Sequence, residues 1–270
     1  MTIDHWVKLA SDRLKGAGIE ASRLEAQILL GFVLGKDRSW LSAHSGEEIR
    51  DAELQAAALL ERRIGREPLA YITGVREFYG RDFAVTPAVL IPRQETEMLV
   101  EKTMKLAPKG ATVLDLGTGS GCIAISLKCE RPDLHLTAID ISATALEIAE
   151  LNALRHGADI EFIESDRFNH LVNRQFDLIV TNPPYVEIHS MLEPEVSDFE
   201  PESALYSGSD GLDFYRSLAT SAPKHLNDGG WLLGEFGLGQ EPGLTEIFGP
   251  NLKSVWNDLA GIPRVCAIQF

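Results

Sequence analysis

The chain has 270 residues, of which 44% are hydrophobic and 24% charged, so it is neither a disordered nor a collagen-like chain. Its 40 acidic and 25 basic residues give a formal net charge of −15, which disfavours general binding to nucleic acid or anionic membranes. The sequence lacks a signal-peptide pattern, a run of 18 apolar residues, and the cysteine spacing of a disulfide framework or metal site. We therefore expect a soluble, cytoplasmic protein without a metal.

Apolar residues at helical spacing mark the first 70 residues. Helices are predicted over residues 3–16, 21–34, 37–43 and 47–64, and glycines end the first two. The segment 71–92 then alternates aromatic and β-branched residues with polar ones, which predicts a β-hairpin joining two domains. A further helix is expected over residues 95–106. The predicted helical domain therefore spans 1–70 and the hairpin linker 71–92.

From residue 111 the pattern changes to strands that alternate with helices. Strands are predicted over 111–116, 134–139, 160–163, 176–180, 230–235, 252–257 and 264–270, and helices over 120–129, 143–155, 211–226 and 240–248. This alternation is typical of an α/β domain with a mostly parallel sheet, here residues 93–270. The loop 258–263 is too short for a parallel crossover, so the last strand is expected to be antiparallel.

A glycine-rich turn, DLGTGSG over residues 115–121, joins the first of these strands to a helix. Such a turn brings the backbone close to a ligand at the carboxyl edge of the sheet, although it can also be only a tight turn. Asp140 ends the second strand, where a carboxylate can accept the ribose hydroxyls of a nucleoside or cap the next helix. Together they predict an adenosine-containing cofactor, either a dinucleotide or S-adenosylmethionine. Asp115 favours the latter, since a carboxylate suits an amino group and opposes a pyrophosphate.

The fourth strand runs into Asn182, Pro183, Pro184 and Tyr185. Two prolines fix the backbone of this turn, and the residue before a proline is held in an extended conformation. The side-chain carbonyl of Asn182 and the backbone carbonyl of Pro183 then offer two acceptors, and Tyr185 offers a flat wall. Two acceptors and a wall suit a planar –NH₂ group. The turn therefore predicts methyl transfer to a planar amino or amide nitrogen.

These motifs resemble those of the release factor glutamine methyltransferases. The similar segments are PLAYITG (68–74), EFYG (77–80), VLIPRQETEMLVE (89–101), DLGTGSGCIAIS (115–126), TNPPY (181–185), EPESAL (200–205), DGLDFYRSLA (210–219) and DLAGIPRV (258–265). The resemblance implies a Rossmann-like class I methyltransferase sheet and S-adenosylmethionine as cofactor. It also implies that the acceptor is the side-chain amide nitrogen of the Gly-Gly-Gln glutamine of peptide chain release factors. The N-terminal helical domain would help to hold that protein, and a monomer without bound nucleic acid is expected.

The resemblance also implies roles for individual residues. The cofactor would be held by Asp115, Gly117, Thr118, Gly119, Ser120, Gly121, Asp140, Asp166, Arg167 and Asn182. The substrate glutamine would be held by Asn182, Pro183, Pro184 and Tyr185, of which Asn182, Pro183 and Tyr185 are the expected catalytic residues. Apart from the resemblance, Phe78 and Tyr79 either wall the site or pack in the core, and the acidic run 193–200 is expected to be a solvated loop, with contact to a basic partner as the alternative. Three positions depart from the family pattern: Gln94 replaces a proline, Arg167 stands where an aromatic residue is frequent, and Glu241 stands where glycine is usual. The E-x-G-x-x-Q spacing that precedes Glu241 is kept in Glu235, Gly237 and Gln240.

Three alternative functions share parts of this pattern. A glutamine methyltransferase for a ribosomal protein has the same core motifs. An adenine-N6 methyltransferase would use the same Asn-Pro-Pro-Tyr turn, but the acidic charge argues against nucleic acid. A non-catalytic protein that binds S-adenosylmethionine or a partner does not need the intact turn.

Overall fold

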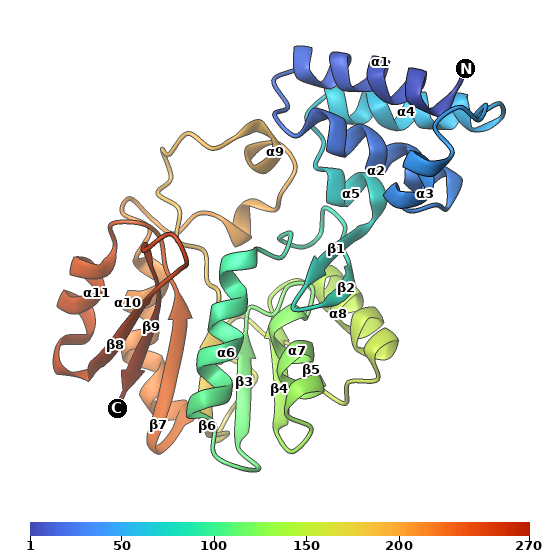
Figure 1. The fold of residues 1–270 in the computed structure, drawn as a ribbon. Helices are drawn as coiled ribbons and strands as arrows, with labels where there is room; N and C mark the ends of the chain where they lie inside the picture. The colour runs from blue at the N-terminus through green and yellow to red at the C-terminus, as the bar shows by residue number, and fades with distance from the viewer. The chain divides into compact units, whose positions relative to one another are not determined.

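A computed structural model describes all 270 residues, which form two compact units (Figure 1). The first unit contains residues 1–74 and 193–199, and the second contains residues 75–192 and 200–270. The chain therefore leaves the second unit at residue 193 and returns to it at residue 200. No helix is long and apolar enough to cross a membrane.

The first unit is a small helical bundle. Its helices are α1 (Ile3–Gly16), α2 (Ser22–Leu34), α3 (Arg38–Ala43), α4 (Ala52–Ile64) and α5 (Leu69–Thr73). Apolar side chains from all five helices share one core. The prediction of helices is confirmed for most of these residues. It is wrong for residues 47–51, which are not helical. Ile49 is buried and its amide donates to the carbonyl of Met1, while Glu48 pairs with Thr2, so pairing with the N-terminus overrides the helical pattern.

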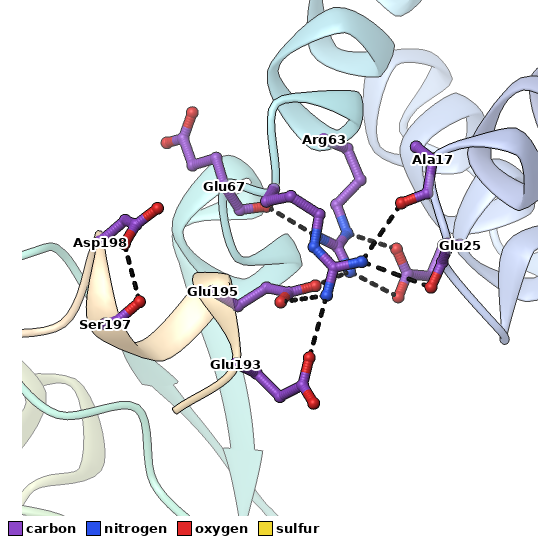
Figure 2. Close-up of polar contacts among 10 residues, drawn as sticks. Ala17, Glu25, Arg63, Glu67, Glu193, Glu195, Ser197 and Asp198 are labelled. Carbon is purple, nitrogen blue, oxygen red and sulfur yellow. Dashed lines mark hydrogen bonds and ion pairs between the residues drawn. The ribbon is translucent and has the colours of Figure 1, made fainter. Parts of the chain in front are cut away.

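Segment 193–199, which includes α9 (Pro194–Ser197), belongs to this helical unit through ion pairs (Figure 2). The Arg63 side chain is only 7% exposed and contacts both Glu25, at 2.6 Å, and Glu195, at 3.1 Å. A second guanidinium, that of Arg66, lies 2.5 Å from Glu195. The expectation of a solvated acidic loop is therefore wrong for Glu195, because two arginines on the same unit neutralise it. It is also wrong for Glu200, which is buried and paired with Arg93.

The hairpin that follows is formed by β1 (Val75–Phe78) and β2 (Arg81–Ala84). Its two-residue turn, Tyr79 and Gly80, has positive φ at both positions (52° and 72°), as the preferred hairpin turns require. Phe78 is buried in the core of the second unit, and Tyr79 packs against that core. Neither residue lines the cavity described below, so of the two alternatives the structure supports core packing.

The second unit is built on a seven-stranded sheet. Its strands are β3 (Thr112–Leu116), β4 (His135–Asp140), β5 (Glu161–Glu164), β6 (Phe176–Thr181), β7 (Leu226–Glu235), β8 (Leu252–Asn257) and β9 (Pro263–Gln269), in the order β5-β4-β3-β6-β7-β9-β8. All neighbouring pairs are parallel except those of β9 with β7 and β8, which are antiparallel. The predicted α/β class and the antiparallel last strand are thereby confirmed.

Helices cover both faces of this sheet (Figure 1). They are α6 (Glu97–Leu106), α7 (Cys122–Glu130), α8 (Ala143–His156), α10 (Asp213–Ser221) and α11 (Glu241–Phe248), with short 3₁₀ turns at 94–96, 202–204, 222–225 and 249–251. Side chains alternate along each strand, so Val113 packs with α6, α7 and α8 while Leu114 packs with α10 and α11. The helix predicted over 211–226 is shorter than expected, because Pro223 cannot continue its hydrogen bonding and Leu226 already pairs with β6.

Candidate active site

A cavity of about 490 Å³ opens at the carboxyl ends of β3, β4 and β6. The central strand β3 has β4 on one side and β6 on the other, so the strand order reverses there. Ligands of open α/β sheets bind at such a point. The cavity is lined by ten of the residues predicted from the sequence: Gly117, Thr118, Gly119, Ser120, Asp140, Asp166, Arg167, Asn182, Pro183 and Pro184. Three other predicted residues, Asp115, Gly121 and Tyr185, do not line it.

The glycine-rich loop has a backbone that side chains would strain. Gly117, Gly119 and Gly121 all have positive φ, at 75°, 55° and 80°. A Cβ added at Gly117 or Gly119 would meet nothing within 4 Å, so the space over the loop is open to a ligand. A Cβ at Gly121 would instead lie 2.8 Å from Ile125 and 3.2 Å from Ala149. Gly121 therefore lets α7 pack closely against α8, beneath the loop.

A buried asparagine on α8 supports this loop from below. The Asn152 amide nitrogen donates to the carbonyls of Ser120, at 2.9 Å, and Ala84, at 3.0 Å. Its side-chain oxygen accepts from the amide of Ala84 at 2.7 Å. All three backbone groups that Asn152 contacts are buried, so one side chain ties β2 to the glycine loop. Sequence reasoning missed Asn152, whose signal is a single amide within an apolar helix.

Asp115 lies under the loop and is fully buried. One carboxylate oxygen accepts from the Thr118 hydroxyl at 2.6 Å and from the Ala124 amide at 3.2 Å, and the other has no partner. Burial is the main cause that raises the pKa of Asp115 to about 7, against the hydrogen bonds from Thr118 and Ala124, which lower it. A buried acceptor of this kind suits a cationic group.

Asp140 has two functions in the geometry of the loop. Its carboxylate accepts from the amides of Gly119, at 2.9 Å, and Ser142, at 3.0 Å. Each oxygen retains a second lone pair, so Asp140 can hold the loop and still accept from ligand hydroxyls. Ser142, rather than Asp140, caps α8 by accepting from Ala145 at 3.2 Å.

Arg167 lies on the wall beyond β5 and has a positive φ of 51°. Its guanidinium contacts the Asp166 carboxylate at 3.1 Å and donates to the Ser217 hydroxyl at 2.8 Å. Two fixed contacts hold a planar cation on the cavity wall. A guanidinium plane can stack on an aromatic ring, so Arg167 can take the place of the aromatic residue that is frequent here.

Asn182, the first residue of the Asn-Pro-Pro-Tyr turn, lines the cavity. The Asn182 amide nitrogen donates to the Thr96 hydroxyl at 3.2 Å, and the Asn182 side-chain oxygen is buried without a partner. Thr96 in turn donates to Glu235 at 2.5 Å, and Tyr185 donates to the other oxygen of Glu235 at 3.1 Å. Tyr185 was expected to form a flat wall, but its hydroxyl is used inside the protein. Burial and the Glu235 charge raise the pKa of Tyr185, so its hydroxyl stays protonated.

The backbone of this turn is held by the C-terminal part of the chain. Gln240 donates to the carbonyls of Tyr185, at 2.9 Å, and Asp210, at 3.0 Å, and accepts from the Gly237 amide at 2.8 Å. A Cβ at Gly211 would lie 2.1 Å from the Tyr185 carbonyl oxygen, so only glycine allows this approach. Sequence reasoning assigned no role to Glu235, Gln240 or Thr96. Their signals are the E-x-G-x-x-Q spacing and the segment that follows Pro92.

The segment that carries Gln94 is fixed without the second proline. Glu200 is 5% exposed and accepts from the Arg93 guanidinium at 2.5 Å and from the Ile91 amide at 3.1 Å. Gln94 itself begins a short 3₁₀ turn that leads into α6. The buried carboxylate of Glu200 thus provides a restraint on this segment.

Comparisons with known proteins match both parts of the chain. A family model described as the PrmC N-terminal domain matches residues 5–74, and one described as the methyltransferase small domain matches residues 94–198. The chain is 46% identical over 234 residues to the release factor glutamine methyltransferase of Geobacter sulfurreducens, covering 86% of this chain and 82% of that protein. It is 45% identical over 273 residues to the enzyme of the same name from Koribacter versatilis, covering 98% and 97%. A methyltransferase structure from Pyrococcus furiosus shares the fold, with a TM-score of 0.52 and 19% identity over 81% of this chain and 98% of that one.

Proposed function

The chain belongs to the release factor glutamine methyltransferase family, and from that membership we propose its reaction. It transfers a methyl group from S-adenosylmethionine to the side-chain amide nitrogen of the Gly-Gly-Gln glutamine in peptide chain release factors. The observation that carries this proposal is the Asn182 side-chain oxygen, a buried acceptor without a partner, on the wall of the cavity.

The residues at the carboxyl edge of the sheet fit S-adenosylmethionine. The open space over Gly117 and Gly119 admits a ligand close to the backbone. Asp115 does not line the cavity, so its carboxylate favours the cationic methionine end by its charge from beneath the loop. Asp140 keeps free lone pairs for ribose hydroxyls, and the fixed guanidinium of Arg167 offers a plane for adenine. When bound, this cofactor supplies an electrophilic methyl group on a sulfonium sulfur.

Asn182 and Pro183 act on the nucleophile. An amide nitrogen is a weak nucleophile, because its lone pair is delocalised into the carbonyl group. The side-chain oxygen of Asn182 and the backbone oxygen of Pro183 accept its two hydrogens, which raises the electron density on nitrogen and fixes its direction. Positioning of this kind supplies most of the rate enhancement, together with stabilisation of the positive charge that develops on nitrogen. The proton leaves the nitrogen after the methyl group has been transferred, so no strong general base is needed.

Labelled S-adenosylmethionine and three acceptors test the proposal directly. The acceptors are an unmodified bacterial release factor, the same factor with the Gly-Gly-Gln glutamine replaced, and duplex DNA. Label on the first acceptor alone supports the proposal. Label on DNA, or equal label on both forms of the factor, would overturn it. If none is labelled, a ribosomal protein is the acceptor to test next, because such an enzyme shares the core motifs.

A further inference from the structure

We propose that Thr96 and Glu235 are positioning residues for Asn182. They hold its side-chain amide so that the oxygen points toward the substrate nitrogen that receives the methyl group. The three residues form a chain of hydrogen bonds, with Asn182 donating to Thr96 at 3.2 Å and Thr96 donating to Glu235 at 2.5 Å. This inference rests on the proposed function for its meaning in catalysis. Its structural part, the orientation of one amide, can be tested separately.

The direction of these bonds follows from the number of hydrogens. A carboxylate only accepts hydrogen bonds, and a hydroxyl has one hydrogen to donate. Both oxygens of Glu235 are used, one by Thr96 and the other by Tyr185. The single hydrogen of Thr96 is therefore committed to Glu235. Thr96 can only accept from Asn182, so the nitrogen of that amide must face Thr96 and its oxygen must face the other way.

Burial makes this arrangement strict. Thr96 is 2% exposed and Glu235 is 1% exposed, so water does not offer either group an alternative partner. If the Asn182 amide rotated by half a turn, its oxygen would face the oxygen of Thr96 with no hydrogen between them. Two acceptors in contact in a buried site are unfavourable, and the donor nitrogen would then face the substrate –NH₂. Glu235, acting through Thr96, thus determines whether the oxygen or the nitrogen of the Asn182 side chain faces the substrate.

The same contacts explain how distant segments meet at the turn. Thr96 lies at the start of α6, Glu235 at the end of β7 and Asn182 at the end of β6. None of the bonds is local, since Thr96 is 86 residues from Asn182 and 139 residues from Glu235. Thr96 and Asn182 line the cavity, whereas Glu235 lies behind them. Glu235 therefore acts on the reaction through the other two residues.

Four variants separate positioning from simple packing. Thr96→Val keeps the shape of the side chain and removes the hydroxyl, whereas Thr96→Ser keeps the hydroxyl. Glu235→Leu removes the acceptor and frees the Thr96 hydrogen to bind the Asn182 oxygen. Thr103→Val is the matched control, because Thr103 is a fully buried threonine on α6 that bonds only its own helix, at Leu99.

The kinetic expectation is a change in kcat with release factor as acceptor. Thr96→Val and Glu235→Leu are expected to lower kcat by about a hundredfold, the usual cost of a misplaced reacting group. The KM for S-adenosylmethionine should be unchanged, Thr96→Ser should restore most of the rate, and Thr103→Val should match the parent protein. Equal kcat in Thr96→Val and the parent would overturn the inference, as would equal loss in Thr96→Ser and Thr96→Val.

A spectroscopic measurement tests the orientation without any acceptor. The side-chain ¹⁵N–H₂ signal of Asn182, assigned by its disappearance in Asn182→Ala, should show slow hydrogen exchange in the parent protein and in Thr96→Ser. It should show fast exchange or a large shift in Thr96→Val and Glu235→Leu, and no change in Thr103→Val. An unchanged signal in Thr96→Val and Glu235→Leu would overturn the inference even if the enzyme methylates release factors. A changed signal in a protein that labels no release factor would support it and sink the proposed function alone.

Discussion

Asn152 supports the cofactor loop through contacts whose loss can be given a magnitude. It is fully buried and makes three hydrogen bonds, to the amide and carbonyl of Ala84 and to the carbonyl of Ser120. Replacement of Asn152 by alanine leaves these three backbone groups buried without partners. Each such group costs about 1–3 kcal/mol, so the free energy of unfolding should fall by about 3–9 kcal/mol. That is a large part of the stability of an ordinary domain.

Urea denaturation of Asn152→Ala, followed by circular dichroism, measures this change. The midpoint should fall strongly with an unchanged slope, and a variant that is unfolded without urea would agree with the expected magnitude. Asn169→Ala is the control, because Asn169 is exposed and should change stability by less than about 0.5 kcal/mol. Cofactor affinity, measured by calorimetry on the folded variant, should also fall because Ser120 lines the cavity. A midpoint equal to that of Asn169→Ala would refute the reasoning.

Three further predictions test other parts of the account. Asn182→Ala should abolish methyl transfer and keep cofactor binding, whereas Asp140→Ala should weaken cofactor binding first. Calorimetry measures cofactor binding, and transfer of label from S-adenosylmethionine measures activity. Equal losses of binding and activity in both variants would contradict the assigned roles. Burial, helped by the charge of Glu95, raises the pKa of Glu235. The hydrogen bonds from Thr96 and Tyr185 and the charge of Arg264 lower this pKa, but by less. The carboxylate form of Glu235 holds the Asn182 amide, so kcat should fall as the pH falls, and the fall should begin at a higher pH than an ordinary glutamate would cause. A flat profile of kcat against pH would count against this. Arg63→Ala leaves Glu25 without its partner, while Glu195 keeps Arg66, so the change should cost about 3 kcal/mol in thermal or urea unfolding. An unchanged midpoint would show that the cluster in Figure 2 is not stabilising.

The parts of the site that sequence reasoning found are local in the chain. The glycine loop occupies seven consecutive residues and the Asn-Pro-Pro-Tyr turn four, and each follows a strand with a clear apolar pattern. Because the carboxyl ends of parallel strands meet at one edge, these segments could be placed together before the structure was known. The order of strands and helices along the chain was also predictable, because each element has a local apolar pattern.

The supporting contacts were not predictable, because they join residues far apart in the chain. Asn152 bonds Ala84 at a separation of 68 residues, and Thr96 bonds Glu235 at 139. Nothing in the local pattern shows which polar residue will be buried or what will satisfy it. The helix predicted to begin at residue 47 failed in the same way, since the pairing of Glu48 with Thr2 depends on the tertiary fold. The role of Tyr185 as a wall stays a prediction: the residue does not line the cavity, and its hydroxyl donates to the buried Glu235, a contact that the local sequence does not indicate.

The central claim is that Asn182 directs one amide nitrogen of a release factor to the methyl donor. Fragment mass spectrometry of a release factor, incubated with S-adenosylmethionine and either the parent protein or Asn182→Ala, tests it most directly. The account predicts one added methyl group, located on the side-chain amide of the Gly-Gly-Gln glutamine, with the parent protein and none with the variant. A methyl group on another residue, or the same modification by Asn182→Ala, would contradict it.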